Sequence, residues 1–321
     1  MTISEQAAVL VETGFDRPRK QVGLWSLAFQ RLRRNRLAMA GGMVLLVIIA
    51  VATLAGLVDI VGRYRPSEQQ YEQILTGPTG DHWFGTDNLG RDTWARTWEG
   101  ARISLKIGIG TQAVVLCIGI AVGAGAALGS RWTDGVLMRF TDLMYAFPDL
   151  LAIILMRAVL SQRDWPIIGT GDPQIPGMPG PLLQVVLAIS FVGWVTLARL
   201  VRGQMLALKD MEYVVAARSM GASERRVVFV HMLPNTLGPV IVAVTFGIPT
   251  AIFAEAFLGF IGFGLPPPTA SLGTLVADGY TYVRVNEWMI AVPSAFIALL
   301  MLCFTFLGDG LRDALDPRTR R

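Results

Sequence analysis

Two carboxylates stand inside long apolar runs, where an ionisable side chain is costly and usually has a partner or a function. Asp149 directly follows Pro148, and Glu255 lies six residues after Pro249. Because proline interrupts helical hydrogen bonding and bends the helix, this pairing favours helices that line an opening. We therefore interpret these four residues as candidates for a solute pathway. A structural ion pair or a shallow position at the membrane interface is the alternative for each carboxylate.

The other reactive side chains form no recognisable catalytic or metal-binding set. The only histidines, His82 and His231, are far apart in sequence and cannot form an H-E-x-x-H zinc motif. Cys117 and Cys303 both fall within apolar runs and predict neither a disulfide framework nor a metal pair. No lysine follows a glycine, which excludes the Gly-Lys-Ser/Thr loop of a Walker A ATP site. We expect no enzyme active site, metal or cofactor in this chain.

A polar segment, residues 212–235, separates two apolar runs and has the sequence of two short helices. Gly221 is expected to end the first helix in the left-handed conformation, and Ser223 to cap the second. Spacings of three and four residues put several side chains on one face of the first helix, and its small alanines would let a partner protein approach closely. The residues assigned to this docking element are Glu212, Tyr213, Val215, Ala216, Ala217, Met220, Gly221, Ser223 and Arg225.

The composition predicts an all-α integral membrane protein. Of the 321 residues, 53% are hydrophobic and only 16% are charged, against about a quarter charged in soluble domains. Roughly 20 apolar residues in a helix cross the ~30 Å hydrocarbon core. We predict six transmembrane helices at 37–60, 103–129, 137–160, 182–201, 236–262 and 287–308. The alternative, a soluble enzyme with a large apolar core, leaves these uncharged runs unexplained.

The distribution of basic residues predicts the orientation. Lysine and arginine are concentrated in the segments that share a side with the amino terminus, and such segments are cytoplasmic. Both termini, residues 1–36 and 309–321, and the loop 202–235 are therefore predicted to be cytoplasmic. The basic pI near 9.3 follows from this topology and needs no nucleic-acid partner. Asp142, near the inner end of the third span, is expected to pair with Arg139.

The first outer loop, residues 61–102, contains a candidate amphipathic helix. Asp92 could cap this helix, whose apolar face would carry two tryptophans. Such a face suits a helix lying in the outer membrane interface. The residues of that face are Trp94, Trp98, Ala101 and Leu105. The helix could anchor the following span or take part in substrate delivery.

Several blocks resemble the permease subunits of ABC importers. The spacing Val215-Ala216-Ala217, Gly221, His231, Leu233-Pro234 is similar to the "EAA–Gly–Leu-Pro" loop that docks on the nucleotide-binding subunit, with Val215 where glutamate is commonest. Blocks at 82–92, 100–105, 255–267, 271–275 and 308–317 resemble the dipeptide/oligopeptide/nickel permeases. The sequence Arg34-Asn-Arg-Leu-Ala38 before the first span is similar to the second, C-type, permease of such systems.

This resemblance implies a type I ABC importer permease fold with a core over 103–308, in a bacterial or archaeal plasma membrane. It implies a homologous permease, two ATPase subunits and an extracytoplasmic solute-binding protein as partners, with ATP and Mg bound by the ATPases. Di- and oligopeptides are the expected substrates; nickel chelates, glutathione and other small solutes are alternatives within the same class. A self-contained secondary transporter or channel is the alternative of a different class, and it leaves segment 212–235 unexplained.

Overall fold

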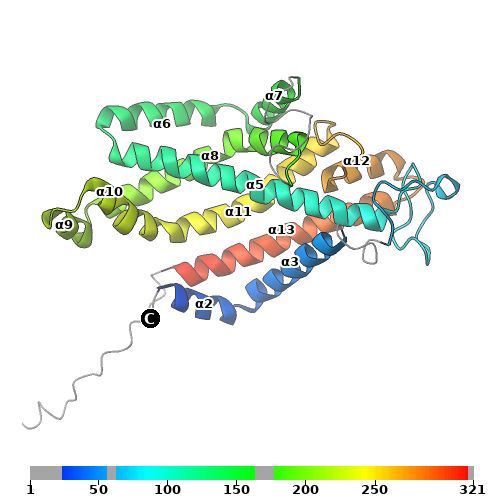
Figure 1. The fold of residues 1–321 in the computed structure, drawn as a ribbon, viewed down its shortest axis with the longest axis horizontal. Coiled ribbons are helices and arrows are strands. Elements are labelled where there is room, and N and C mark those ends of the chain that lie inside the picture. The colour runs from blue at the N-terminus through cyan, green and yellow to red at the C-terminus, as the bar shows by residue number, and fades with distance from the viewer. Residues whose placement is uncertain (1–23, 56–62, 163–176, 317–321) are drawn as a thin grey trace, which may run out of the picture.

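The computed structural model describes residues 24–55, 63–162 and 177–316. These residues are helical apart from connecting segments and an isolated bridge between Thr86 and Asp92. The predicted all-α class is therefore confirmed for the described part of the chain. Figure 1 shows the long helices running side by side, with short elements gathered at both ends of the bundle.

Five stretches of helix are long and apolar enough to cross a membrane. They contain α3 (Arg36–Ala55), α5 (Thr93–Leu128), α8 (Gly180–Lys209), α11 (Leu233–Phe260) and α13 (Trp288–Leu315). Two further helices, α6 (Arg131–Ala146) and α7 (Asp149–Ser161), pass the same test only together, and they meet at 93°. The described residues therefore hold five candidate spans, or six if the bent pair counts as one. The third span predicted over 137–160 falls on this pair, and its bend at Pro148 is far sharper than an ordinary proline kink.

Two shorter helices, and the end of a long one, lie where the sequence predicted tails or loops. The first described helix, α2 (Leu24–Arg34), lies inside the predicted amino-terminal tail, and α12 (Leu272–Tyr282) fills the connection before α13. The carboxy-terminal tail predicted from 309 is helical up to Leu315, as the end of α13. Figure 1 places α2 beside the end of α13, and α12 at the opposite end of the bundle.

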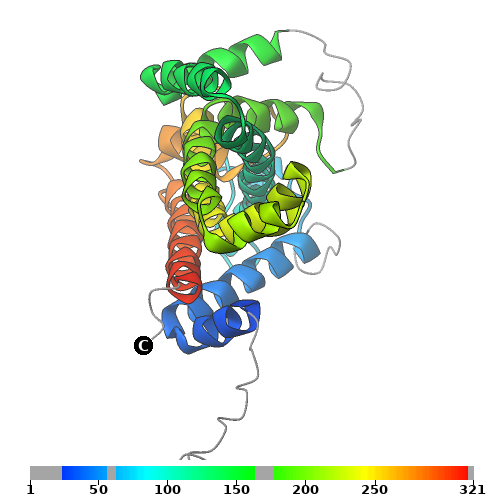
Figure 2. The ribbon, with the colours of Figure 1, turned by 90° about the vertical axis from the view of Figure 1, so that its left-hand side faces the viewer.

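Helix α5 is at the centre of the packing, and Figure 2 shows it among the other long helices. Its buried side chains contact α8 and α11 through a cluster that includes Ile107, Val185 and Leu258, all fully buried. In the hydrophobic window of α8, 72% of the residues are buried, against 28% for α3 and α13. The bundle thus encloses α8 and leaves broad apolar faces on α3 and α13 for lipid or other subunits.

The predicted short interfacial helix and the second span form one continuous helix, α5. Asp92 caps it as predicted, accepting a hydrogen bond from the Ala95 amide at 2.8 Å. The tryptophan-bearing face is buried inside the bundle, with Trp98, Ala101 and Leu105 at 8%, 0% and 5% exposure. The expected position in the outer interface is therefore wrong, because α3 and α13 pack over this face.

Residues 63–92 form a compact segment against the start of α5; we name this segment the outer cap, after the side of the membrane predicted for it. His82 Nδ1 lies 2.7 Å from Asp92 Oδ2, the same carboxylate that caps α5. The Asn286 side-chain amide donates to the Thr76 carbonyl oxygen at 3.0 Å. The outer cap is therefore attached both to α5 and to the residues that precede α13.

Two ion pairs attach α6 to α8. Arg202 binds both carboxylate oxygens of Asp134, at 2.5 and 2.6 Å, and Arg199 Nη2 lies 2.8 Å from Asp142 Oδ1. The expected pairing of Asp142 with Arg139 on its own helix is wrong, because the neighbouring helix brings Arg199 within reach.

The contact between α12 and α13 leaves no space for a side chain at Gly279, which gives a first prediction. A Cβ there would lie 2.5 Å from the backbone of Met289. We expect Gly279→Ala to lower the free energy of unfolding by about 1–3 kcal/mol, since overpacking forces backbone shifts. Gly135 on α6 has nothing within 4 Å of its Cβ position, so Gly135→Ala should stabilise slightly. Equal melting temperatures of the two purified variants would contradict this prediction.

Candidate functional site

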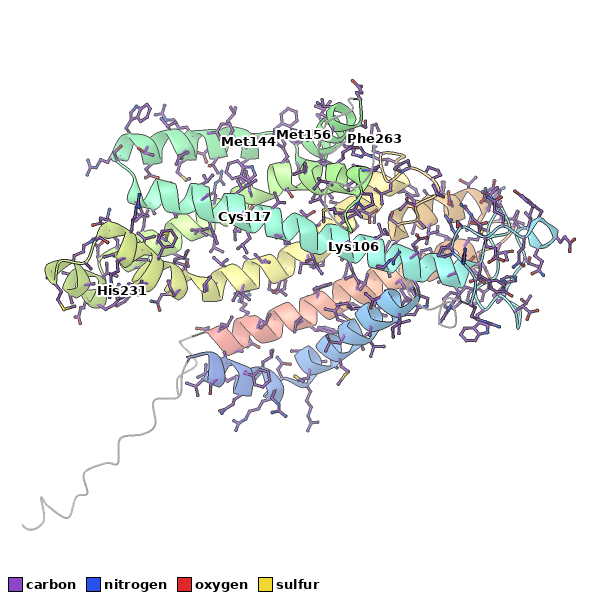
Figure 3. All side chains as sticks on the ribbon, viewed as in Figure 1. Lys106, Cys117, Met144, Met156, His231 and Phe263 are labelled. Atoms are coloured by element: carbon purple, nitrogen blue, oxygen red, sulfur yellow. The ribbon has the colours of Figure 1, made fainter. Side chains whose placement is uncertain are left out.

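The segment between α8 and α11, in which Figure 3 labels His231, projects from one end of the bundle (Figure 1). It begins with α9 (Glu212–Ser219), followed by the short α10 (Glu224–Arg226) and a π-helical turn, Val227–Met232. That turn leads directly into α11, so the predicted second helix is the beginning of the fifth span and not a separate element. Pro234, the second residue of α11, directly follows this π-helical turn inside the continuous helix.

The turn after α9 has the geometry of a Schellman motif. Gly221 has a φ of +82°, and its amide donates to the Arg218 carbonyl at 2.9 Å. The Ala222 amide donates to the Ala217 carbonyl at 3.1 Å. This pair of bonds closes a helix end whose C′ residue is left-handed, a conformation that glycine adopts without steric cost. The predicted left-handed helix end at Gly221 is confirmed; its assignment to ATPase coupling stays a prediction.

Two further interactions hold the turn in shape. The Ser223 hydroxyl accepts from the Arg226 amide at 3.4 Å, as the capping prediction requires. Arg218 binds Glu224 through both carboxylate oxygens, at 3.1 and 3.2 Å. The pair spans the turn from the last residues of α9 to the first of α10. An exposed pair of this kind contributes little stability, but its two-point geometry fixes the relative direction of the two helices.

The inner face of α9 packs against the bundle. Val214 and Ala217 are 0% and 3% exposed and belong to a cluster with Met205, Val227 and Met232. Ala217 therefore faces the core of its own subunit, and its assignment to a surface that contacts a partner is wrong. The sequence could not distinguish it from its neighbour, since both are alanines.

The face of α9 and of the following turn that points away from the bundle is exposed, and the residues at its centre are apolar. Met220, Val215 and Tyr213 are 82%, 50% and 41% exposed. Partial burial raises the pKa of the Tyr213 phenol above its ordinary value, so this side chain is neutral at physiological pH. We name the predicted docking residues that are exposed the docking face; they are Glu212, Tyr213, Val215, Ala216, Met220, Gly221, Ser223 and Arg225.

The structure adds two residues that the sequence interpretation missed. Phe229 and Val230, in the π-helical turn, are 67% and 56% exposed. Their neighbours Val227 and Val228 are buried. The available signal was four consecutive apolar residues after Arg226, which cannot all point inward from one helix.

The two adjacent alanines give a second prediction. Ala217→Glu would place a charge in the subunit's core without a partner, which costs several kcal/mol, so we expect the variant to accumulate poorly in the membrane. Ala216→Glu makes the same chemical change on the exposed face and should leave abundance unchanged. Immunoblots of membrane fractions measure both. Normal abundance of Ala217→Glu would show that this face of α9 is open and would contradict the placement.

The first pair of candidate pathway residues lies at the corner between α6 and α7. Pro148 is the residue before α7 and Asp149 is its first residue, and both are exposed. A carboxylate in the first turn interacts favourably with the positive end of the helix dipole. The assignment of this pair to the pathway stays a prediction.

The second pair is enclosed within the subunit. Glu255 is 1% exposed and accepts a hydrogen bond from the Ser104 hydroxyl at 2.8 Å, which joins α11 to α5. Pro249, two turns earlier on α11, is also buried. Their assignment to the pathway likewise stays a prediction, and this burial does not support it, since both side chains point into the packed bundle.

Comparison with known proteins identifies close relatives across nearly the whole chain. The oligopeptide transport system permease protein OppC of Bacillus subtilis is 40% identical over 303 residues, which cover 94% of this chain and 92% of the relative. The dipeptide transport system permease protein DppC of the same organism is also 40% identical, over 92% of this chain and 86% of the relative. OppC of Haemophilus influenzae is 36% identical over 92% of this chain and 89% of its own.

A solved structure shares the fold. A chain of the MetNI methionine ABC transporter, in its inward-facing conformation, aligns with a TM-score of 0.52 and 18% identity over 68% of this chain and 94% of its own. Residues 117–321 match the family described as binding-protein-dependent transport system inner membrane component. Residues 23–78 match the N-terminal TM domain of oligopeptide transport permease C. The chain therefore belongs to the family of binding-protein-dependent transport system inner membrane components and is a C-type permease of an ABC importer.

Proposed function

We propose that this chain forms half of the path by which an ATP-driven importer carries di- and oligopeptides across the plasma membrane. The observation that carries the proposal is the docking face: an exposed apolar surface on a turn held by a Schellman motif, a serine cap and an ion pair. A soluble loop that merely connects two spans has no need of this rigidity. The kinship with oligopeptide and dipeptide permeases supports the peptide as substrate.

The complete transporter, in this proposal, contains a homologous permease, two ABC ATPase subunits and an extracytoplasmic solute-binding protein. The ATPases bind ATP and Mg and catalyse hydrolysis, and the docking face couples their movement to this subunit. Purification of the chain with its co-expressed neighbours tests the assembly. Recovery of two ATPase subunits and of substrate-stimulated ATP hydrolysis is the expected result. Transport by the purified chain without an ATPase would instead identify a self-contained secondary transporter or channel.

The proposed topology has six spans, with α6 and α7 together forming the third and both termini in the cytoplasm. Labelling of single cysteines tests it after Cys117 and Cys303 are replaced by alanine. A cysteine at exposed Ser67, in the outer cap, should react with an impermeant thiol reagent in intact cells. A cysteine at Ser223 should react only after the membrane is opened. Labelling of position 223 in intact cells would reverse the orientation.

The substrate class is tested on the binding protein, because a permease path is open to more than one solute. Mass spectrometry of the ligand that co-purifies with the binding protein should detect short peptides. A retained nickel chelate, glutathione or another small solute, with no peptide, would keep the ABC permease assignment and replace the substrate.

A further inference from the structure

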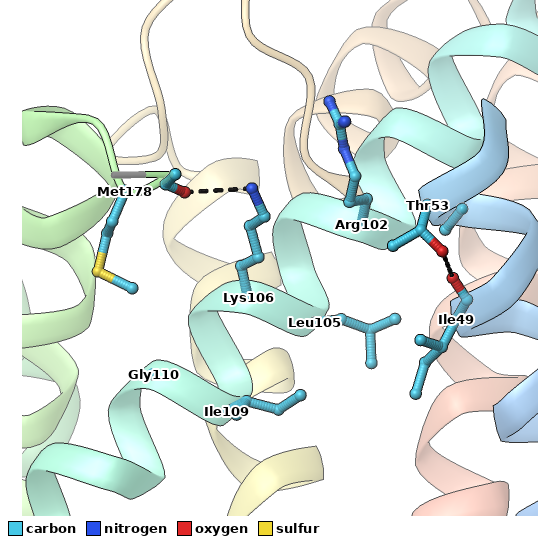
Figure 4. A pocket seen from close by; sticks show the side chains of 10 residues that line it. Ile49, Thr53, Arg102, Leu105, Lys106, Ile109, Gly110 and Met178 are labelled. Atoms are coloured by element: carbon cyan, nitrogen blue, oxygen red, sulfur yellow. Dashed lines mark hydrogen bonds between the residues drawn. The ribbon is translucent and has the colours of Figure 1, made fainter. Parts of the chain in front are cut away.

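A cavity of about 450 Å³ lies between α3, α5 and the residues leading into α8. Its volume is within the range of small-molecule sites, about 300–1,000 Å³. Most of its wall is apolar, formed by Ile49, Ala52, Leu105, Ile109 and Met178. Two basic side chains, Arg102 and Lys106, also line it, on successive turns of α5. Figure 4 shows both of them extending to the same side of α5, above Leu105 and Ile109.

The two basic groups form no ion pair among the described residues. Arg102 Nε is buried without a hydrogen-bond partner there. Glu99, one turn earlier, attracts Arg102 electrostatically without forming an ion pair with it. Lys106 Nζ donates a hydrogen bond to the Gly177 carbonyl at 3.1 Å, a neutral acceptor, and no carboxylate of the described residues pairs with it. Two cations so close together on one wall create a positive potential that favours an anionic group.

The wall opposite these cations belongs to α3, a helix with exposed apolar side chains. After Arg36, α3 contains no charged residue, and Leu46, Val47 and Leu54 are 64%, 53% and 47% exposed. Such a face is suited to contact with acyl chains wherever no other subunit covers it. The cavity therefore lies between α3, at the edge of the bundle, and α5, in the core of the subunit.

The polar and apolar parts of the cavity lie at different depths. Along α5, Ile109 is about 10 Å farther from the outer-cap end than Arg102, at 1.5 Å per residue. A ligand that fits must carry an anionic head near the outer end and an apolar chain directed into the membrane. A phosphate with an attached acyl chain has this shape. Basic residues near the membrane surface attract anionic headgroups in the same way.

We propose that this cavity binds one anionic phospholipid, with its phosphate between Arg102 and Lys106 and an acyl chain along Ile49 and Ile109. The lipid fills the space between α3 and the core helices. The site does not depend on which solute the permease carries. Because the bound lipid contacts both α3 and the core helices, it contributes to the attachment of α3 to the rest of the subunit.

Native mass spectrometry of the purified transporter complex tests the proposal. Phosphatidylglycerol and phosphatidylcholine with identical acyl chains are added in turn, and the lipids retained by the complex are counted. We expect a preference for phosphatidylglycerol of roughly ten-fold, since both basic residues attract its net charge. The double variant Arg102→Gln/Lys106→Gln should reduce the preference to less than about two-fold. Arg284→Gln, at an exposed arginine outside the cavity, should retain it.

A second variant tests the apolar part of the site with the charges in place. Ile109 is 49% exposed and lines the cavity, so Ile109→Trp should fill it without a fold-breaking clash and remove the retained lipid. Three results would overturn the proposal: equal retention of the two lipids by the wild type, an unchanged preference in the double variant, or unchanged retention by Ile109→Trp. A photoreactive benzophenone side chain at position 109 that cross-links to the second permease, and not to phospholipid, would also overturn it.

Discussion

Gly221→Val should remove most transport while leaving the amount of protein in the membrane unchanged. The substitution puts a β-branched residue at a φ of +82°, which costs about 1–2 kcal/mol or more and favours a different turn. No atom lies within 4 Å of the Cβ position, so the effect arises from the backbone alone. The altered turn redirects Met220 and the docking face. We expect uptake to fall roughly 5- to 30-fold, with ATP hydrolysis no longer stimulated by the loaded binding protein.

Two control variants distinguish the effect of backbone strain at position 221 from the effect of replacing a glycine with a larger residue. Gly203 lies within α8 and also has nothing within 4 Å of its Cβ position, so Gly203→Val makes the same change at a helical φ and should transport normally. Gly221→Asn introduces a residue that tolerates the left-handed region and should retain intermediate or normal uptake. If Gly221→Val transports as well as Gly203→Val at equal abundance, the turn has no part in coupling.

Met220→Glu should release the ATPase subunits from an otherwise intact permease. Met220 is 82% exposed, so the permease itself loses no core contact. In the assembly proposed above the same position would be buried against an ATPase, and a buried carboxylate without a partner is strongly unfavourable. Loss of a central apolar anchor costs about 2 kcal/mol or more in typical interfaces. We expect the ATPase recovered with tagged permease to fall at least about thirty-fold.

The matched control is Val285→Glu. Val285 is also an exposed apolar residue, at 68%, but it lies between α12 and α13 at the opposite end of the bundle. This variant should retain its ATPases. Equal loss of ATPase from both variants would point to general damage by a new surface charge, and retention by both would remove Met220 from the interface.

Local signals in the sequence predicted the parts of the fold that depend on local chemistry. Apolar runs predicted the long helices. Asp92, Gly221 and Ser223 predicted helix ends, and the structure confirms these ends. The continuity of α5 was missed because a short amphipathic helix and a span look alike when they follow each other without a break. The 93° corner at Pro148 was missed because proline signals a bend without giving its size.

The sequence predicted that segment 212–235 docks on a partner, but it did not predict which side chains of that segment are exposed. A periodic pattern shows which side chains share a face of α9, whereas only the packing of Val227 and Met232 determines that Ala217 lies inside. The ion pair of Asp142 with Arg199 depends in the same way on the neighbouring helix. The assignment of Glu255 to the pathway relied on its charge within an apolar run. Its hydrogen-bond partner in the structure is Ser104, 151 residues earlier in the chain. Such long-range contacts are not encoded in any local window.

The unbroken length of α5 has a mechanical consequence. Its 36 residues extend about 54 Å at 1.5 Å per residue, well beyond the ~30 Å hydrocarbon core. Asp92 joins its first turn to His82 of the outer cap, and α6 starts within a few residues of its last turn. A rigid rotation of about 10° about the midpoint of such a rod moves its two ends by about 5 Å in opposite directions. If α5 rotates in this way, displacement of the outer cap would produce an opposite displacement of α6 at the other end of the bundle, without any change in α5 itself.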